Sequence, residues 1–474
     1  MSRSRAGVVS GVFLLVAALS ACVETRLVDL PAYEDPPTGA EGFLGYANSQ
    51  SKRPVCGNCH IGQNAEWKNT KHASAWAGLQ ASGSAQAACE GCHTVNHLGN
   101  RTTKELVGWN ATKDARYQDV QCESCHGPGL EHVTNPDATQ PLASILVGTT
   151  LTNGCGECHQ GTHNPFIEEW SASRHSNIGN SASARPLADG CPACHEARGI
   201  LSAWNVKAEY LEKQQTGVIP ITCAVCHDPH DPTNSRQLRF PISTANVETN
   251  LCMKCHHRRA VPDLAAASRG PHSPQGPLLI GEGVGWTPPN FAYQGDKIIG
   301  THGTQANPRL CATCHVSRLE VTDAQTGSFV FNATGHLFKA IACLDAQGKP
   351  TTSDNCTLSQ RTFKACTAAG CHGTEASARS ALTVARGRID GLVASLSALL
   401  ARVPASEFNN NDSRFTTAEG AKFNASLGIL KGSPIHNPFL VEALLTSSIK
   451  QVMTDYGLAA PPNLVLDNLL DPGQ

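Results

Sequence analysis

One short motif, Cys-x-x-Cys-His, occurs eight times in this chain of 474 residues and constrains its fold more than any other feature. The first cysteines of the motifs are Cys56, Cys89, Cys122, Cys155, Cys191, Cys223, Cys252 and Cys311. The second cysteines are Cys59, Cys92, Cys125, Cys158, Cys194, Cys226, Cys255 and Cys314. The histidines are His60, His93, His126, His159, His195, His227, His256 and His315. Chance would produce about 0.04 such motifs at this composition, so the spacing is selected for one chemistry.

That chemistry is covalent attachment of haem. Two thiols three positions apart on a helical turn reach the two vinyl groups of one haem, and the following histidine binds the iron. Zinc-binding Cys-x-x-Cys pairs do not need a histidine after every second cysteine, and a thioredoxin-like motif occurs once rather than eight times. A disulfide framework of this density is unusual in so long a chain. The motifs therefore predict eight haem c groups, with these histidines as proximal iron ligands.

A ninth attachment site is predicted at Cys366-Thr-Ala-Ala-Gly-Cys371-His372, where four residues rather than two separate the cysteines. A small bulge would still let both sulfurs reach the porphyrin. The alternative is a disulfide pair that precedes a histidine. Counting nine haems leaves, besides one cysteine near the N-terminus, only Cys343 and Cys356 among the 21 cysteines. These two could form a disulfide, which would contribute roughly 3 kcal/mol to stability.

The N-terminus is typical of an exported protein. Its apolar run over residues 8–19 is too short to span a bilayer but has the length of a signal-peptide core. The run ends in Leu-Ser-Ala-Cys22, which resembles a bacterial lipobox and implies a signal peptide over residues 1–21 and lipidation of Cys22. The alternative is a plain signal peptide with an incidental cysteine. Because Val23 rather than aspartate follows, we expect a lipid anchor in the outer membrane, with residues 22–55 as linker, facing the periplasm or the cell exterior.

The composition leaves little material for a large side-chain core. Only 5% of residues are aromatic, and glycine and proline together number 70 (42 plus 28). A chain of this length still needs buried apolar mass, which the faces of closely packed haems would supply. We therefore expect a mainly α-helical fold with much irregular coil, organised around its haems. The formal net charge of −2 gives no field that would attract nucleic acid.

The haem-binding region contains an internal repeat. Each copy has a Cys-x-x-Cys-His motif, then Glu-Trp, then a histidine expected on a short helix, and then two further motifs. The copies define three-haem modules over residues 56–150 and 151–245. We expect the equivalent histidines, His72 and His175, to be distal ligands, each to a haem of its own module.

The rest of the chain divides into two regions. Residues 246–373 complete the haem-binding region, and residues 374–474 lack cysteine. Apolar residues at helical spacing predict a long C-terminal helix between an N-cap at Thr374 and a stop at Pro404. Two shorter helices are predicted over residues 415–430 and 438–456. This C-terminal region is expected to pack on the haem body.

Eleven histidines lie outside the attachment motifs and are the candidate distal ligands. They are His72, His97, His132, His163, His175, His230, His257, His272, His302, His336 and His436. Nine haems need nine such ligands, so these eleven histidines are enough for bis-histidine ligation of every iron, and two of them are not needed. Met453 is the only methionine outside the N-terminus and the motifs, which nearly excludes the higher-potential His/Met ligation.

Several short motifs carry a family resemblance. The order Cys-x-x-Cys-His, Glu-Trp, Ser/Thr-x-His resembles the tetrahaem cytochromes of ammonia oxidation. The same order is also similar to that of the pentahaem nitrite reductases and of the octahaem hydroxylamine oxidoreductase and tetrathionate reductase group. The stretches around His132, His230, His272 and His436 resemble sequences of these proteins as well. The resemblance implies a mostly helical fold with closely stacked haems and bis-histidine iron. The nitrite reductases' lysine-ending motif and the hydroxylamine oxidoreductases' crosslinking tyrosine have no match here, so both known catalytic devices are missing.

These features together predict a low-potential electron carrier without catalytic residues, working in a respiratory or extracellular electron-transfer chain. About 50 residues per haem place the haems near contact, so that electrons can hop between them. The expected partners are other redox proteins or quinol-linked donors, and assembly with outer-membrane cytochromes or with further copies of the chain stays open. The alternative is a multihaem reductase of small nitrogen or sulfur oxyanions, which needs one open iron.

Overall fold

The computed structural model describes most of the chain between Tyr33 and Leu466. The described residues are 33–137, 139–148, 154–161, 164–177, 185, 190–264, 268–289, 291, 302–303, 306–323, 325–367, 371–409, 412, 414–462 and 464–466. The predicted signal peptide, Cys22 and His163 lie outside them. Within the described ranges no helix combines the length and the apolar character that crossing a membrane requires.

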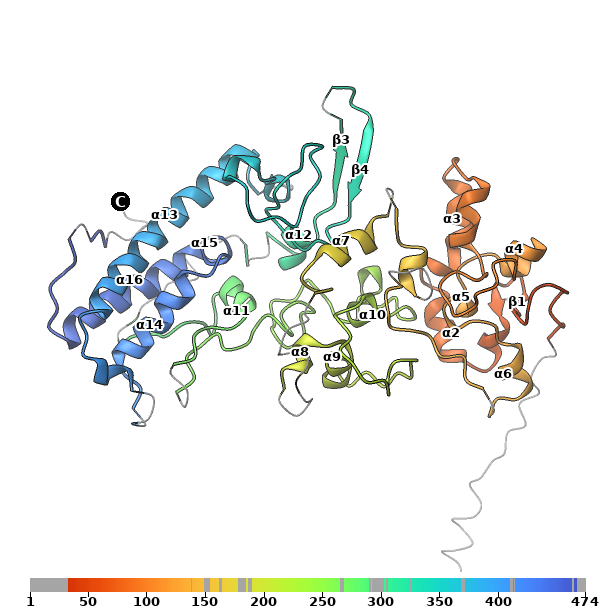
Figure 1. Cartoon of the computed structure of the whole chain (residues 1–474), viewed down its shortest axis with the longest axis horizontal. Helices are drawn as coiled ribbons and strands as arrows, with labels where there is room; N and C mark the ends of the chain where they lie inside the picture. Colours follow the sequence, from red (N-terminus) through yellow and green to blue (C-terminus); the bar gives the residue numbers. More distant parts are fainter. Residues whose placement is uncertain are drawn as a thin grey trace, which may run out of the picture.

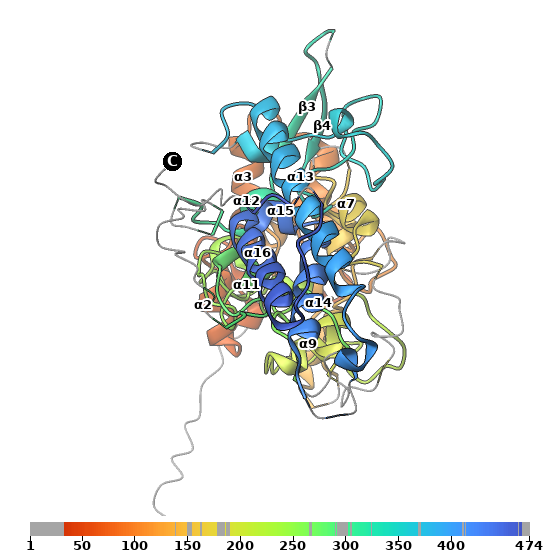
Figure 2. The ribbon, with the colours of Figure 1, turned by 90° about the vertical axis from the view of Figure 1, so that its left-hand side faces the viewer.

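The molecule is elongated, and the chain runs along its length (Figure 1). The first three motifs lie at one end, and the C-terminal helices form the other end, which faces the viewer in Figure 2. The architecture is mainly helical with much coil and few short strands, which confirms the predicted fold class.

The helices of the haem-binding region are short, because each motif closes one turn and irregular chain follows. They are α2 Ile61–Trp67, α3 Ala75–Ala81, α4 Trp109–Thr112, α5 Cys122–His126, α6 Leu130–Thr134, α7 Phe166–Ala172, α8 Pro192–His195, α9 Ala197–Ala203, α10 Cys223–Cys226, α11 Gln275–Ile280 and α12 Cys311–His315. The 3₁₀ turns are η2 Val55–Asn58, η3 His72–Ser74, η4 Ala87–His93, η5 Ala115–Tyr117, η6 Cys155–Glu157, η8 Ser235–Gln237, η9 Leu358–Gln360, η10 Lys364–Thr367 and η11 Ala405–Phe408.

Two small antiparallel hairpins interrupt this pattern. Their strands are β1 Tyr46–Asn48 with β2 Arg53–Pro54, and β3 Leu319–Thr322 with β4 Phe329–Ala333. The β3–β4 hairpin projects from the body above α12 and α7 (Figure 1). The sequence prediction contained neither hairpin.

The C-terminal helices form the largest apolar core among the described residues. They are α13 Glu375–Leu400, α14 Thr417–Gly428, α15 Ser433–His436 and α16 Pro438–Asp455. Thr374 caps α13 by accepting a hydrogen bond from the Ser377 N–H, as the sequence predicted. The stripe of Ile389, Leu392, Leu396 and Leu399 is buried against α14 and α16.

The two modules repeat the same tertiary hydrogen bonds. The indole of Trp67 donates to the Val120 carbonyl, and that of Trp170 donates to the Ile221 carbonyl. Val120 and Ile221 in turn donate their N–H groups to the carbonyls of the equivalent histidines, both at 3.1 Å. The Glu-Trp and histidine signatures therefore fix the same local structure before the third motif of each module.

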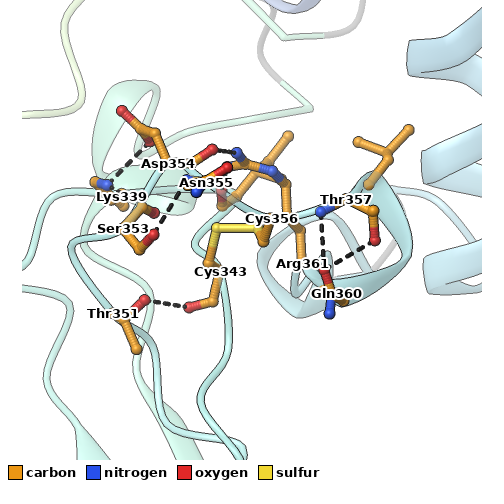
Figure 3. Close-up of a disulfide and its surroundings, with 12 residues drawn as sticks. Lys339, Cys343, Thr351, Ser353, Asp354, Asn355, Cys356, Thr357, Gln360 and Arg361 are labelled. Carbon is orange, nitrogen blue, oxygen red and sulfur yellow. Dashed lines mark hydrogen bonds and ion pairs between the residues drawn. A yellow bond between two sulfur atoms is a disulfide. The ribbon is translucent and has the colours of Figure 1, made fainter.

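Cys343 and Cys356 form a disulfide with their Cα atoms 6.0 Å apart (Figure 3). The bridge joins the segment after β4 to the segment before η9. Neighbouring bonds hold the loop between them: Thr351 donates to the Cys343 carbonyl, and Arg361 donates to the Asp354 carbonyl at 2.8 Å. These are the two cysteines that the nine-haem count left over.

Candidate functional site

The local unit of the site is the motif turn. The N–H of His60 donates to the Cys56 carbonyl at 2.9 Å, and the N–H of His159 donates to the Cys155 carbonyl at 3.0 Å. This bond closes one helical turn, which presents both sulfurs and the imidazole together. We number these sites 1 to 8 in chain order and the expanded motif site 9.

Site 9 makes the same closing bond across a longer loop. The His372 N–H donates to the Cys366 carbonyl at 3.0 Å, although two more residues lie between them than in the other motifs. Cys366, Cys371 and His372 line the same cavity as the other motifs. The expanded motif therefore has the same closing hydrogen bond as the other motifs and faces the same cavity.

Eight of the nine motif histidines face a second histidine among the described residues. The pairs are His60 with His132, His159 with His72, His126 with His230, His195 with His272, His227 with His336, His256 with His175, His315 with His436, and His372 with His302. The ring centres in these pairs are 6.1 to 6.5 Å apart.

This separation has a simple chemical meaning. Imidazole nitrogens bind a metal ion at about 2.0–2.1 Å and lie about 1.2 Å from their ring centre, so two rings on opposite sides of one metal have centres about 6.4 Å apart. Rings in direct packing contact have no reason to keep this one distance in eight separate places. The spacing fits one iron between each pair.

Hydrogen bonds at the other ring nitrogen orient several of these imidazoles. The Nδ1 atom of His126 lies 2.6 Å from the Pro141 carbonyl oxygen, and that of His132 lies 2.7 Å from the Thr139 oxygen. His302 makes the same kind of contact with another backbone carbonyl, at 2.6 Å. Donation from Nδ1 fixes the tautomer and leaves Nε2 free for a metal.

Burial favours the neutral form of four of the facing imidazoles. It lowers the pKa of His436 to about 3 and the pKa values of His72, His175 and His336 to about 4. In each case the motif histidine that the ring faces lowers the pKa further. Neutral imidazole is the form that binds a metal.

A continuous cavity of about 4260 Å³ connects most of the sites. Its walls include the motif residues of sites 2 and 4 to 9, except Cys191 of site 5, and six of the facing histidines. A pocket for one drug-sized ligand measures only about 300–1,000 Å³. The cavity is therefore large enough for several stacked macrocycles, as nine closely packed haems would require.

Several of the histidine pairs cross the module boundaries. His72 of the first module faces His159 of the second, and His175 of the second module faces His256 of the following region. The expectation that each would serve a haem of its own module is therefore wrong. The two histidines are still equivalent, because each reaches the first motif of the next part of the chain.

Site 2 differs from the other sites. Among the described residues no histidine ring faces His93, whose Nδ1 atom lies 2.8 Å from the Ala75 carbonyl oxygen. Of the three remaining candidate ligands, His97 contacts Asn110, and His163 lies outside the described residues. His257 uses its Nδ1 atom on the Met253 carbonyl, at 2.6 Å.

Aromatic and acidic residues that the sequence did not single out complete the surroundings. Phe166 packs edge-on against His159 and His336, with ring centres 5.6 and 4.8 Å apart. Glu123, inside the third motif, accepts hydrogen bonds from the backbone of Leu44 and Gly45. Burial raises the pKa of Glu123 to about 7 although these bonds oppose the shift. The sequence feature that could have pointed to Glu123 is its position between the two cysteines of the motif.

Contacts between cysteines of different motifs give the order of the sites. Cysteine sulfurs of different motifs lie side by side in five places: Cys56 with Cys122, Cys92 with Cys158, Cys155 with Cys223, Cys194 with Cys255, and Cys252 with Cys311. Three further pairs lie near each other: Cys125 with Cys155, Cys226 with Cys255, and Cys314 with Cys371. Each site therefore adjoins at least one other site.

Comparisons with known proteins support the haem attachment motifs. Residues 55–127, which span sites 1 to 3, match the family of cytochrome c554 and c-prime. Residues 220–261, which span sites 6 and 7, match the doubled CXXCH motif. Neither the curated proteins nor the solved structures gave a match. Together with the repeated attachment motifs, the two family matches identify the chain as a multihaem c-type cytochrome that transfers electrons through covalently bound haem.

Proposed function

We propose that the chain is an electron conduit of nine haems, at least eight of which have iron between two histidines. The observation that carries the proposal is the set of eight facing histidine pairs with ring centres 6.1 to 6.5 Å apart. Two strong ligands leave no position on an iron for a substrate, so such haems accept and pass on electrons. The motif histidine of each pair is the proximal ligand, and its partner is the distal ligand.

The contacts between motif cysteines support a branched path. The main line runs through sites 1, 3, 4, 6, 7, 8 and 9, and sites 2 and 5 branch from sites 4 and 7. The branches leave the line at equivalent places in the repeat. Electrons would therefore travel the length of the molecule, from the first module to the C-terminal helices.

The haem iron supplies the change between the ferric and ferrous states. Each motif would bind one haem through two thioethers, hydrogen bonds at Nδ1 would orient several of the imidazoles, and the shared cavity would enclose most of the macrocycles. Enclosure lowers the polarity around the iron and helps to set its potential.

Spin-state spectra of the purified holoprotein test this proposal. We expect nine haems per chain, with at least eight ferric haems low-spin and unable to bind carbon monoxide after reduction, because two histidines hold each iron. Absorption and electron paramagnetic resonance spectra, recorded with and without carbon monoxide, provide the count. Two or more haems that bind carbon monoxide would contradict the proposed ligand set.

A second candidate function rests on site 2. Since no described histidine faces His93, one iron could keep an open position, and the other haems would then feed electrons to it. This is the arrangement that a reductase of small nitrogen or sulfur oxyanions needs. One carbon monoxide-binding haem in the same spectra would favour this function, and its absence would favour the conduit alone.

The proposed location is the outer membrane, through a lipid on Cys22, where other redox proteins or quinol-linked donors would supply electrons. Replacing Cys22 with alanine should move most of the protein from the membrane fraction to the soluble fraction, because the anchor is lost. Fractionation followed by haem staining measures the distribution, and Cys343→Ala serves as a control cysteine outside the lipobox. Retention of C22A on membranes would rule out anchoring through this residue.

A further inference from the structure

The loop after β4 carries His336, the histidine that faces His227 at site 6. A buried carboxylate holds this loop from a distant part of the chain. Glu169, on α7, accepts hydrogen bonds from the backbone N–H groups of Thr334 and His336, both at 2.7 Å. Figure 1 shows α7 beside the base of the β3–β4 hairpin. The contact ties the second module to the segment that supplies its distal ligand.

The same carboxylate also reaches the imidazole through a hydroxyl group. The Oγ1 atom of Thr334 donates to a Glu169 oxygen at 2.8 Å and lies 3.1 Å from the Nδ1 atom of His336. Glu169 and Thr334 are only 8% and 5% exposed, so water does not screen this chain of contacts.

The direction of the hydrogen bonds follows from the chemistry of the three groups. A carboxylate only accepts, so the single hydroxyl proton of Thr334 is committed to Glu169. If Nε2 of His336 binds iron, its Nδ1 atom carries the proton and donates to the oxygen of that hydroxyl. The proton order is therefore imidazole to hydroxyl to carboxylate.

We propose that Glu169 tunes the haem at site 6, acting through Thr334 on the distal ligand His336 to lower the reduction potential of that haem. The inference rests on the proposed function, because it needs His336 on the iron. A negative charge behind the imidazole makes the ligand a stronger electron donor and favours ferric over ferrous iron. Glu169 is thus a positioning residue that also sets the electronic character of the ligand.

Site 6 differs in this respect from most of the other described sites. The Nδ1 atoms of His93 and His126 contact neutral backbone carbonyls, and so do those of His132, His302 and His315. Glu66, the repeat equivalent of Glu169, is exposed in the first module. At site 3 the Asp228 carboxylate lies 3.4 Å from the Nδ1 atom of His230 and is paired with Arg239. Among the described contacts, a relay through a hydroxyl group is therefore particular to site 6.

One nearby cation also affects the reduction potential of this haem. Arg318 interacts electrostatically with His336 and lies over the Phe166 ring, 5.8 Å from its centre. Its charge favours ferrous iron and partly opposes that of Glu169. Arg318 is exposed and therefore screened, whereas Glu169 is buried, so the carboxylate has the larger effect.

The test compares Glu169→Gln and Thr334→Val with the wild-type holoprotein, and uses Glu66→Gln as the matched control. Potentiometric titrations followed by absorption and electron paramagnetic resonance record the potential and spin state of each haem. In both variants we expect the reduction equilibrium of one haem to shift at least tenfold toward the ferrous state. This corresponds to a rise of about 59 mV in its reduction potential for one electron. The haem should stay low-spin. T334V removes the hydroxyl but keeps the Thr334 carbonyl and the backbone N–H groups that bind Glu169.

The outcomes separate this inference from the proposed function. An unchanged potential in T334V would overturn the relay, even if E169Q folds poorly or loses a ligand. A shift of equal size in the Glu66→Gln control would also overturn it, because the effect would then not depend on the buried contact. His336→Ala tests the underlying ligand set: without a new high-spin haem in that variant, His336 is not a ligand and the proposed function is wrong at site 6.

Discussion

Replacing His175 with alanine is expected to convert one low-spin haem into a high-spin haem that binds carbon monoxide when reduced. His175 faces His256 at site 7 with the ring centres 6.4 Å apart, and the ring packed against it, 4.4 Å away, is Phe338, which cannot bind iron. Phe338 therefore cannot take the place of the lost ligand. Absorption and electron paramagnetic resonance spectra with carbon monoxide measure the change.

The position of site 7 makes the functional effect large. Its cysteines interact with those of sites 5, 6 and 8, so the proposed path has no route around it. Loss of a histidine ligand raises the potential of one haem and creates a trap, and a trap about 1.4 kcal/mol deep slows transfer about tenfold. Stopped-flow oxidation of the reduced protein by an electron acceptor should show this slowing.

His257 provides a matched control for this experiment. It directly follows the motif histidine of the same site, but its Nδ1 atom contacts the Met253 carbonyl and no iron-spaced partner faces its ring among the described residues. His257→Ala should leave both the spectrum and the transfer rate unchanged. If H175A were as fully low-spin as H257A, the assignment of His175 as distal ligand would be wrong.

The sequence predicted those parts of the molecule that depend on local spacing. A cysteine, three further positions and a histidine define one turn, and the same closing bond forms even in the expanded motif at Cys366. The C-terminal helix was predicted for the same reason, since Thr374 and the apolar stripe act within a few residues of each other. Such features need no knowledge of distant contacts.

The histidine pairing could not be predicted in this way. Its members lie far apart in the chain, and each candidate ligand is chemically the same as the others. The repeat showed that His72 and His175 are equivalent, but equivalence does not say whether each turns back to its own module or forward to the next. Glu169 was missed for a related reason, because its partners at Thr334 and His336 lie more than 160 residues away, as the separation of 165 shows.

Removing the cysteines of site 9 is the second experiment with a large expected effect. Cys366→Ser combined with Cys371→Ser should lower the number of covalently attached haems from nine to eight, because no other thiol is placed to form the thioethers. Mass spectrometry of the denatured protein measures this number, since only covalently held haem survives denaturation. The disulfide variant Cys343→Ser with Cys356→Ser is the control: it removes two nearby cysteines and should keep nine haems.

The two double variants should differ in which property they lose, stability or a haem. Loss of the disulfide costs up to roughly 3 kcal/mol of stability but no haem. Loss of site 9 removes the iron between His372 and His302 and truncates the proposed path at site 8, beside the C-terminal helices. An unchanged count, with eight haems in both the wild type and the Cys366 and Cys371 variant, would show that this motif attaches none, and the conduit would then have to end at site 8. The haem count therefore decides whether the expanded motif binds the last haem of the proposed electron path or is a structural loop.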